Sequence, residues 1–345
     1  MKNKSITIIL SLFVILNFSC SNKKDKPEKL MDLFPKEKVL VHTVIQKDIF
    51  NRPTQIIFHN NYLFVIDYYG KSFINIYDLN QNKIVLSFLP KGEGPNETTD
   101  VPTSVYVIND TTMIWYDASR YVREAIFSKS MDQVKSINKK CELKSIMPVL
   151  RIAPIAQNGY VGVGLFDKGK YGIFDHIGNN ITYKYDYPND RINCNPIGKA
   201  IVYQGDFLTN SDYKEILFYT AESEILEFFK TNNPKDFEKV KEIHFDYAKY
   251  KPTEPVPTIK ESHFCFLRGC STDKYVYLLY SGVDSKNVVN ATKGKILLIF
   301  DWKGKAIMKY NLDLEVNTIA VDKDGKVLYA TTDNPEGTLV SFKLK

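Results

Sequence analysis

Residues 54–88, TQIIFHNNYLFVIDYYGKSFINIYDLNQNKIVLSF, place the strongest constraint on what this chain can fold into. Four short runs of β-branched and aromatic residues follow one another there, separated by polar or glycine-containing turns. Connections this short join only neighbouring antiparallel strands, so the segment predicts a four-stranded meander. Such a sheet has two apolar faces and must stack on similar units, so repetition along the chain is the next feature to look for.

Comparable units follow this segment to the end of the chain. The first three begin near Thr54, Thr103 and Ile152, and their spacing of 49 residues is within the range of propeller blades. A fourth unit is expected at residues 199–245 and a fifth at residues 264–310. In the fourth unit, the sequence predicts strands at residues 199–203, 216–220, 225–229 and 240–245.

The two ends of the chain each hold an incomplete unit. Residues 318–342 supply three strands, whereas residues 39–45 form one strand with no partner nearby in the sequence. Together they complete a sixth unit, and closure of this kind removes the open edges of the array. The sequence therefore predicts an all-β fold. It is a six-bladed β-propeller over residues 39–345, with four-stranded antiparallel blades and an N-terminal strand that joins the C-terminal blade.

The composition agrees with packed sheets and argues against a polyanion partner. Aromatic residues make up 13% of the chain, with 22 Tyr and 21 Phe but only 17 Gly, which favours sheets over disorder. The formal charge is +6, and the 40 acidic residues are mixed among the 46 basic ones without a basic run. No nucleic acid partner is therefore expected.

Residues 1–19 have the pattern of an export signal peptide and are excluded from the fold. Lys2 and Lys4 give a positive start, and residues 6–16 are mostly apolar. An apolar stretch this short does not span a bilayer as a permanent helix.

Cys20 follows this stretch, with the small residue Ser19 before it. The arrangement resembles the lipobox of bacterial lipoproteins, in which the signal is removed and the cysteine becomes the lipidated first residue. The alternative is an ordinary secretory signal with an incidental cysteine. Residues 20–38 are rich in Lys, Glu, Asp and Pro, so they are expected to form a flexible tether between lipid and propeller.

Three stretches resemble a known family: FLPKGEGPNE at residues 88–97, LLYSG at residues 278–282, and residues 296–342. On these stretches the chain resembles the TolB-like six-bladed β-propeller lipoproteins of Gram-negative bacterial envelopes. The resemblance implies a protein anchored by its N-terminal lipid in the cell envelope, at the outer membrane, and an association with glycan or nutrient uptake. It leaves open whether the propeller faces the periplasm or the cell surface.

Arginine recurs near the predicted inner strands. Arg52, Arg151 and Arg268 lie there, and Arg120 lies on a hairpin turn. If the first three line the central channel, they form a site for carboxylate or sulfate groups. The alternative is that each pairs with a neighbouring carboxylate or with a carbonyl group at a strand end.

The loop at residues 92–97, GEGPNE, joins the outer strand of the first unit to the inner strand of the second. Its two glycines before a proline allow backbone angles closed to other residues, so the loop is expected to have a defined shape. Glu97 is a candidate ligand contact or a clamp between adjacent blades. Tyr68 and Tyr69 lie on a hairpin and are candidates for stacking on sugars, whereas Trp115 is expected to pack between blades.

The remaining chemical groups favour structural roles. Four cysteines lack metal-binding spacing and are expected to be free, buried thiols, although an oxidising compartment permits a disulfide. They are Cys141, Cys194, Cys265 and Cys270. The turn with Asp322, Asp324 and Gly325 resembles half of a calcium loop but lacks the terminal Glu, so a hairpin turn is expected. No cofactor is predicted, with calcium or another channel-bound metal as the alternative.

These observations lead to two hypotheses of function. The first is a non-catalytic envelope lipoprotein that binds a small ligand, a glycan or an envelope protein on the face that carries residues 92–97. The second is a metal-dependent hydrolase or lyase with its site at the central channel, which needs several His, Asp or Glu residues at the starts of the inner strands. The sequence offers mainly arginines there, which favours the first hypothesis.

Overall fold

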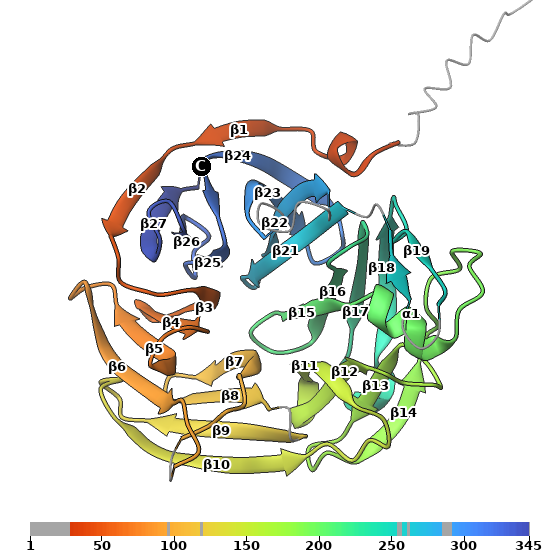
Figure 1. The fold of residues 1–345 in the computed structure, drawn as a ribbon, viewed down its shortest axis with the longest axis horizontal. Helices are drawn as coiled ribbons and strands as arrows, with labels where there is room; N and C mark the ends of the chain where they lie inside the picture. The colour runs from red at the N-terminus through yellow and green to blue at the C-terminus, as the bar shows by residue number, and fades with distance from the viewer. Residues whose placement is uncertain are drawn as a thin grey trace, which may run out of the picture.

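The computed structural model describes residues 28–94, 97–117, 120–253, 257–260, 263–284 and 292–344. In this part of the chain, six antiparallel sheets stand around a central axis, so the predicted all-β six-bladed propeller is confirmed (Figure 1). The predicted signal peptide at residues 1–19 and the predicted lipidation site Cys20 lie outside the described residues. None of the described helices combines the length and the apolar character needed to cross a membrane.

Each blade begins with the strand nearest the central axis. Blade 1 comprises β3 (Pro53–His59), β4 (Tyr62–Asp67), β5 (Ser72–Asp78) and β6 (Lys83–Pro90). Blade 2 comprises β7 (Thr103–Asn109), β8 (Thr112–Tyr116), β9 (Tyr121–Phe127) and β10 (Val134–Glu142). Blade 3 comprises β11 (Val149–Ile155), β12 (Gly159–Gly164), β13 (Tyr171–Phe174) and β14 (Asn180–Lys184), with the 3-10 turn η2 (Ala156–Asn158) between the first two.

The second half of the ring follows the same plan. Blade 4 comprises β15 (Gly205–Thr209), β16 (Glu215–Thr220), β17 (Ile225–Lys230) and β18 (Glu238–His244), with η3 (Pro234–Asp236) before the last strand. Blade 5 comprises β21 (His263–Ser271), β22 (Tyr275–Asp284), β23 (Gly294–Asp301) and β24 (Ala306–Val316). Blade 6 comprises β25 (Thr318–Val321), β26 (Val327–Thr332), β27 (Thr338–Lys343) and a strand from the N-terminus.

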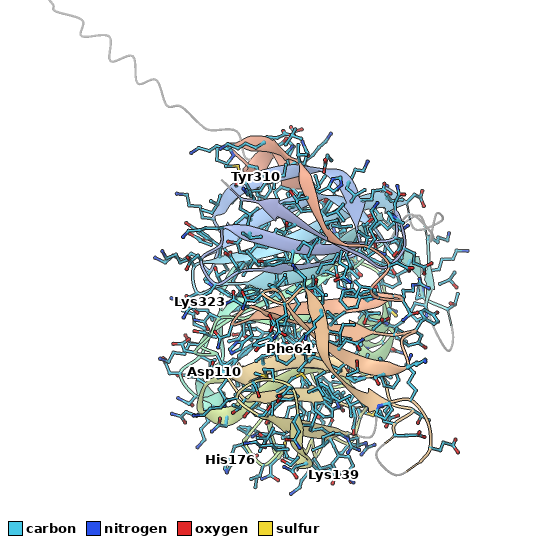
Figure 2. All side chains as sticks on the ribbon, turned by 90° about the vertical axis from the view of Figure 1, so that its left-hand side faces the viewer. Phe64, Asp110, Lys139, His176, Tyr310 and Lys323 are labelled. Atoms are coloured by element: carbon cyan, nitrogen blue, oxygen red, sulfur yellow. The ribbon has the colours of Figure 1, made fainter. Side chains whose placement is uncertain are left out.

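The antiparallel order gives the disc two distinct faces. The turns after the first and third strands of each blade lie on one face, called here the exit face because the inner strands end there. Asp110, His176 and Lys323 lie in such turns and stand along the same side of the disc (Figure 2). The opposite face, where the inner strands begin, is called the entry face and carries the connections between blades.

The ring closes through two N-terminal strands and not one. β2 (His42–Gln46) pairs antiparallel with β27, with His42 opposite Phe342, so the predicted closure by the C-terminal blade is confirmed. β1 (Glu37–Leu40), however, runs parallel to β24 and becomes a fifth strand of blade 5. The single strand predicted at residues 39–45 is therefore divided at Val41 between two blades.

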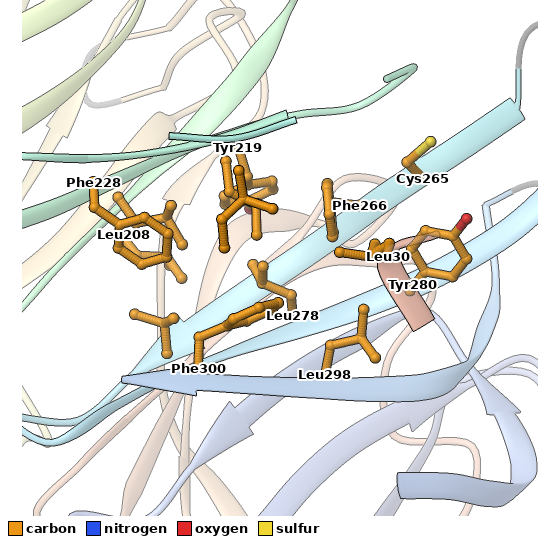
Figure 3. Close-up of a cluster of buried hydrophobic side chains, with 14 of the residues drawn as sticks. Leu30, Leu208, Tyr219, Phe228, Cys265, Phe266, Leu278, Tyr280, Leu298 and Phe300 are labelled. Atoms are coloured by element: carbon orange, nitrogen blue, oxygen red, sulfur yellow. The ribbon is translucent and has the colours of Figure 1, made fainter. Parts of the chain in front are cut away.

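The chain before β1 is also packed against the propeller. The 3-10 helix η1 (Leu30–Leu33) inserts Leu30, which is only 1% exposed, into an apolar cluster that includes Tyr280 (Figure 3). The Phe34 ring lies edge-on to Phe300 with 5.1 Å between the ring centroids. The prediction of a flexible tether over residues 20–38 is therefore wrong from Leu30 onward, because apolar side chains in this lysine-rich stretch are buried. Residues 20–27 lie outside the described part.

The apolar core is divided into six wedges, each between two adjacent blades. One buried cluster joins blades 1 and 2, and similar clusters follow around the ring to the one between blades 6 and 1. Trp115 lies in the cluster between blades 1 and 2 and is 2% exposed, which confirms its predicted packing role. Each blade is thus stabilised by burial of both its faces against its neighbours.

The inner strand of blade 4 differs from the prediction. The stretch at residues 199–203, expected as a strand, is part of helix α1 (Pro196–Val202), and β15 takes the inner position. The helix begins at Asn195, whose side-chain oxygen accepts a hydrogen bond from the N–H of Gly198 at 2.7 Å, and Pro196 occupies the first turn. This local start signal outweighs the β-propensity of the Ile-Val-Tyr sequence that follows.

Helix α1 belongs to a small cap on the entry face, together with the two-stranded hairpin of β19 (Tyr250–Lys251) and β20 (Thr258–Ile259). Asp190, whose side chain is 1% exposed, joins the two loops that build the cap. Its carboxylate accepts hydrogen bonds from Lys199 Nζ at 3.1 Å, Tyr203 OH at 2.8 Å and Tyr250 OH at 2.6 Å. One buried carboxylate thus connects the loop before α1, the end of α1 and the β19 strand.

A buried ion cluster joins blades 3 and 4. The carboxylate of Glu227 on β17 contacts the ammonium of Lys170, which is fully buried, and lies 2.6 Å from both Lys239 Nζ and Tyr171 OH. Burial alone would raise the pKa of Glu227, but the charges of Lys170 and Lys239 outweigh it and lower the pKa to about 2. Burial lowers the pKa of Lys170, and Glu227 opposes that shift. The opposite charges in the cluster thus stabilise one another in their ionised forms.

Candidate functional site

A cavity of about 390 Å³ occupies the exit-face half of the central channel. It is lined by the final residues of five inner strands, β3, β7, β15, β21 and β25, and by the turns that follow them. The sixth inner strand, β11, is covered by Tyr106, whose hydroxyl donates to the carbonyl oxygen of Ile152 at 3.1 Å. Exposed residues in the lining, among them Asn60, Ser211 and Lys323, show that the cavity reaches the exit face.

Polar side chains of the inner strands serve the backbone of other inner strands. An inner strand has one edge without a strand partner, so its carbonyl groups need other donors. Gln55 Nε2 donates to Val105 O at 3.3 Å, and Ser271 Oγ donates to Thr209 O at 2.8 Å. The hydroxyl of Tyr106 also lies 3.4 Å from Phe207 O. These contacts tie neighbouring inner strands together and fix the cavity wall.

Arg268 and Arg151 follow the same principle at the inner end of the cavity. Arg268 Nε donates to Thr54 O at 2.6 Å, from blade 5 to blade 1, and Arg151 Nη1 donates to Leu150 O at 2.8 Å. Neither arginine is among the cavity-lining residues. Both arginines therefore contact strand carbonyl groups, which is the alternative to an anion site that the sequence left open.

A carboxylate lies near these two arginines. Burial raises the pKa of Tyr219, Asp206 raises it further, and both Arg268 and Arg151 lower it. The two guanidinium groups therefore share their part of the channel with the carboxylate of Asp206. A site with three converging arginines for an anion is not what the structure shows, because Arg52 lies elsewhere.

The rim of the cavity carries two carboxylates that are held in place. Asp110 Oδ1 accepts hydrogen bonds from Asn60 Nδ2 at 2.7 Å and lies 3.0 Å from His59 Nε2. These two contacts, first that with His59, lower the pKa of Asp110, and Lys323 adds to the effect. Asp273 Oδ1 accepts a hydrogen bond from the Ser211 N–H at 3.0 Å. Within the described ranges, no hydrogen bond reaches the second oxygen of either carboxylate.

Tyr213 is held at the rim in an uncommon backbone conformation. Its φ of 59° lies in the left-handed region, which a bulky side chain seldom adopts. The loop fixes it there, because its N–H donates to Asn210 O at 3.2 Å and its carbonyl accepts from the Ala156 N–H at 2.9 Å. Burial raises the pKa of Tyr213 to about 12, so its hydroxyl stays protonated at physiological pH.

Arg52, Tyr68 and Tyr69 gather on the entry face, away from the cavity. The Tyr68 and Tyr69 rings meet edge to face at 4.7 Å and are 41% and 58% exposed. The Arg52 guanidinium lies 5.4 Å from the Tyr69 ring centre, and Lys91 Nζ lies 5.6 Å from that of Tyr68. The two tyrosines are exposed, as sugar stacking requires, but each already has a cation against its ring.

Glu97 and Arg120 have local contacts on the same face. Glu97 Oε2 accepts a hydrogen bond from the Gly94 N–H at 2.9 Å, so it closes its own loop. Gly92 has φ +151°, and a Cβ at this position would lie 1.9 Å from Glu97 Oε2, which explains why the loop needs glycine. Arg120 Nη1 donates to Ser145 O at 3.3 Å, which links blade 2 to the connection before blade 3.

The residues at the cavity rim were not singled out from the sequence. Asp110, Ser211 and Asp273 lie in turns after inner strands and have ordinary turn composition. The signal available was positional: such turns surround the channel in a propeller. The Asp322 turn is a hairpin, as expected, because Asp322 Oδ1 accepts hydrogen bonds from the N–H groups of Lys326 and Val327 at 2.6 and 3.0 Å.

Two expectations about chemical groups can be compared with the described residues. No group of three or more His, Cys, Asp or Glu side chains in them is placed to hold a metal ion. In the described part of the chain, none of Cys141, Cys194, Cys265 and Cys270 forms a disulfide, as expected; Cys265 is buried, whereas the other three are only half-buried.

Comparison with known families settles the classification. The sequence profile of a family described as TolB-like 6-blade propeller-like matches residues 32–324. The chain belongs to this TolB-like propeller family. None of the curated proteins matches the sequence of this TolB-like propeller significantly.

Solved structures share the fold of the TolB-like propeller at low sequence identity. Raptor from Chaetomium thermophilum is 10% identical with a TM-score of 0.50, over 89% of this chain and 29% of that one. Regucalcin, a calcium-binding protein from Agrobacterium tumefaciens, is 9% identical with a TM-score of 0.50, over 89% of this chain and 95% of that one. The β-propeller domain of Swd1 from Myceliophteria thermophila is 10% identical, over 88% and 100%, with a TM-score of 0.48. At such identities the likeness concerns the fold alone.

Proposed function

We propose that this TolB-like propeller binds a small ligand in the central cavity of its exit face, as a non-catalytic lipoprotein of the bacterial cell envelope. The observation that carries the proposal is the cavity of about 390 Å³, bounded by five inner strands. Concave sites of a few hundred Å³ with a few placed polar groups are where proteins bind small molecules. The binding face is thus opposite to the one that carries residues 92–97.

The wall of the cavity supports a preformed site. Gln55, Tyr106 and Ser271 fix neighbouring strand edges, and Asp110 and Asp273 are each held by groups next to them. A site whose groups are already ordered loses little conformational entropy when a ligand enters.

The envelope location rests on the N-terminal sequence. The signal at residues 1–19 and the lipobox-like Ser19-Cys20 favour attachment of a lipid to Cys20, with outer-membrane anchoring. Because the packed chain begins at η1, residues 20–29 would form the remaining connection, which reaches at most about 33–36 Å when fully extended. The propeller would then stay close to the membrane surface.

Lipidation is tested by growth with labelled palmitate and by membrane fractionation of wild-type protein and Cys20→Ala. We expect label and membrane association in the wild type and loss of both in the variant. Membrane association that persists without Cys20 would contradict lipid anchoring.

Ligand binding is tested by ligand-observed NMR with mixtures of small metabolites. Ser211→Trp places a large ring at the cavity mouth, whereas the backbone N–H that binds Asp273 is unchanged. The matched control is Lys129→Trp, at an exposed turn of the same face outside the cavity lining. We expect ligands that bind wild type and Lys129→Trp but not Ser211→Trp. Equal binding to all three proteins would place the site elsewhere.

A further inference from the structure

We propose that the ligand of the exit-face cavity is an uncharged saccharide of one or two rings, recognised through its hydroxyl groups. This inference rests on the proposed function, because it names the ligand class of the same cavity. Four properties of the lining carry it: its charge, its available hydrogen-bonding groups, its aromatic residues and its volume.

The charge of the lining disfavours anionic ligands. Its acidic and basic side chains are Asp110, Asp273, Lys323 and His59, so two carboxylates are present with one lysine. Arg151 and Arg268 lie outside the lining and donate to backbone carbonyl groups. A carboxylate or phosphate in the cavity would therefore meet like charges, whereas an uncharged ligand meets only acceptors and donors.

The available groups suit hydroxyl groups better than a peptide. Strand addition by an extended peptide needs free backbone groups at a sheet edge. Here the carbonyl groups of Val105, Phe207 and Thr209 already accept hydrogen bonds from side chains. Among the polar groups at the rim are the second oxygens of Asp110 and Asp273, which accept no hydrogen bond from the described residues. Carboxylate oxygens accept the hydrogen bonds that sugar hydroxyls donate, and these charge-assisted bonds are the strong ones.

Tyr213 and Tyr106 provide aromatic rings, which a sugar ring can contact in addition to hydrogen-bonding partners for its hydroxyl groups. Both line the cavity. A tyrosine combines a flat apolar ring with one hydroxyl, so it can contact the C–H face of a sugar and one of its hydroxyls. The loop hydrogen bonds of the Tyr213 N–H and carbonyl groups hold its backbone in the left-handed conformation before the ligand enters.

The volume sets the size of the ligand. The cavity of about 390 Å³ equals the liquid volume of about 13 water molecules, which is room for one sugar ring with its hydroxyls and part of a second. The exposed rim at Asn60 and Lys323 lets a second ring continue toward solvent.

The test is a titration of purified propeller with five probes. They are maltose, cellobiose, N,N′-diacetylchitobiose, the anion cellobionate and the peptide tri-alanine. The proteins are wild type, Ser211→Trp, the double variant Asp110→Asn with Asp273→Asn, and the control Asp324→Asn, which changes an exposed acid of the same face outside the lining. We expect at least one neutral disaccharide to bind the wild type and Asp324→Asn equally. Affinity should fall tenfold or more in the double variant, and no binding should remain in Ser211→Trp.

Two results would overturn the inference while leaving ligand binding intact. One is preference for cellobionate or tri-alanine over every neutral disaccharide. The other is no saccharide binding although the metabolite mixture yields a ligand that Ser211→Trp excludes. If no compound of either set distinguishes wild type from Ser211→Trp, the proposed function itself fails. Circular dichroism and thermal unfolding of each variant separate loss of binding from loss of fold.

Discussion

Replacing Glu227 with Gln tests how the blades are held together. The substitution keeps the side-chain volume but removes the carboxylate that Lys170 and Lys239 share. The two lysines are affected differently. Lys239 keeps Glu242 at 2.8 Å, whereas Lys170 is fully buried and, among the described residues, forms an ion pair with Glu227 alone. The loss therefore leaves one ammonium without a counter-charge inside the interface of blades 3 and 4.

The magnitude follows from this geometry. Removing one partner of a buried ion pair costs about 3–5 kcal/mol. The pKa of Glu227 leads to a similar value, since lowering it from 4.5 to about 2 corresponds to about 3 kcal/mol of stabilisation. We expect Glu227→Gln to lower the free energy of unfolding at pH 7 by about 3–5 kcal/mol. Lys170→Met should cost less, because Glu227 keeps Lys239, and Lys170→Met with Glu227→Leu should recover most of the loss.

Urea unfolding between pH 7 and 9.5 is the assay. In Glu227→Gln the folded state disfavours a protonated Lys170, so the unfolded state binds more protons and stability should rise with pH, whereas Lys170→Met should lack this rise. In the wild type, the contribution of Glu227 is fully present above pH 4.5 and should disappear as the pH falls toward 2. A loss below about 1 kcal/mol in Glu227→Gln, without the rise at alkaline pH, would refute the reasoning.

Three further predictions concern single contacts. Leu30→Ala should lower the free energy of unfolding by about 2–4 kcal/mol in urea unfolding, because it empties a buried site; an unchanged midpoint would show that η1 is undocked in solution. Asp190→Asn should increase hydrogen exchange in α1 and β19 while the blades stay protected, because it weakens the hydrogen bonds that join the two cap loops. Unchanged exchange in α1 and β19 would contradict the role of Asp190 in joining these loops. Tyr106→Phe should cost about 1–2 kcal/mol in thermal unfolding, since the carbonyl of Ile152 loses its donor; equal stability would mean that water replaces the hydroxyl.

The number and closure of the blades could be predicted because their signals are local. Strands end at turn residues such as Asn60-Asn61, and the counts at the two ends add to one blade. The error at residues 199–203 came from weighing β-branched residues above the start signal Asn195-Pro196, which identifies a helix. The packing of Leu30 and the division at Val41 could not be predicted, because both depend on contacts with β24 and Phe300 that are remote in sequence.

The site was harder to predict than the fold for a physical reason. Arg151 and Arg268 lie on inner strands as expected, but the sequence does not show which backbone carbonyl group each contacts. Side chains such as Tyr106 fill part of the channel, and how they do so decides whether the channel is open at the entry face or at the exit face. Turn residues such as Asp110 and Asp273 become a rim only when turns from five separate blades meet around one axis.

The pairing of β2 with β27 has a consequence for biosynthesis. Residues 42–46 leave the ribosome among the first, whereas their partners at residues 338–343 are the last strand to be made. The final blade therefore cannot be assembled on a nascent chain, and premature termination exposes two strand edges at once. The circle is therefore completed only after residues 338–343 have been released from the ribosome.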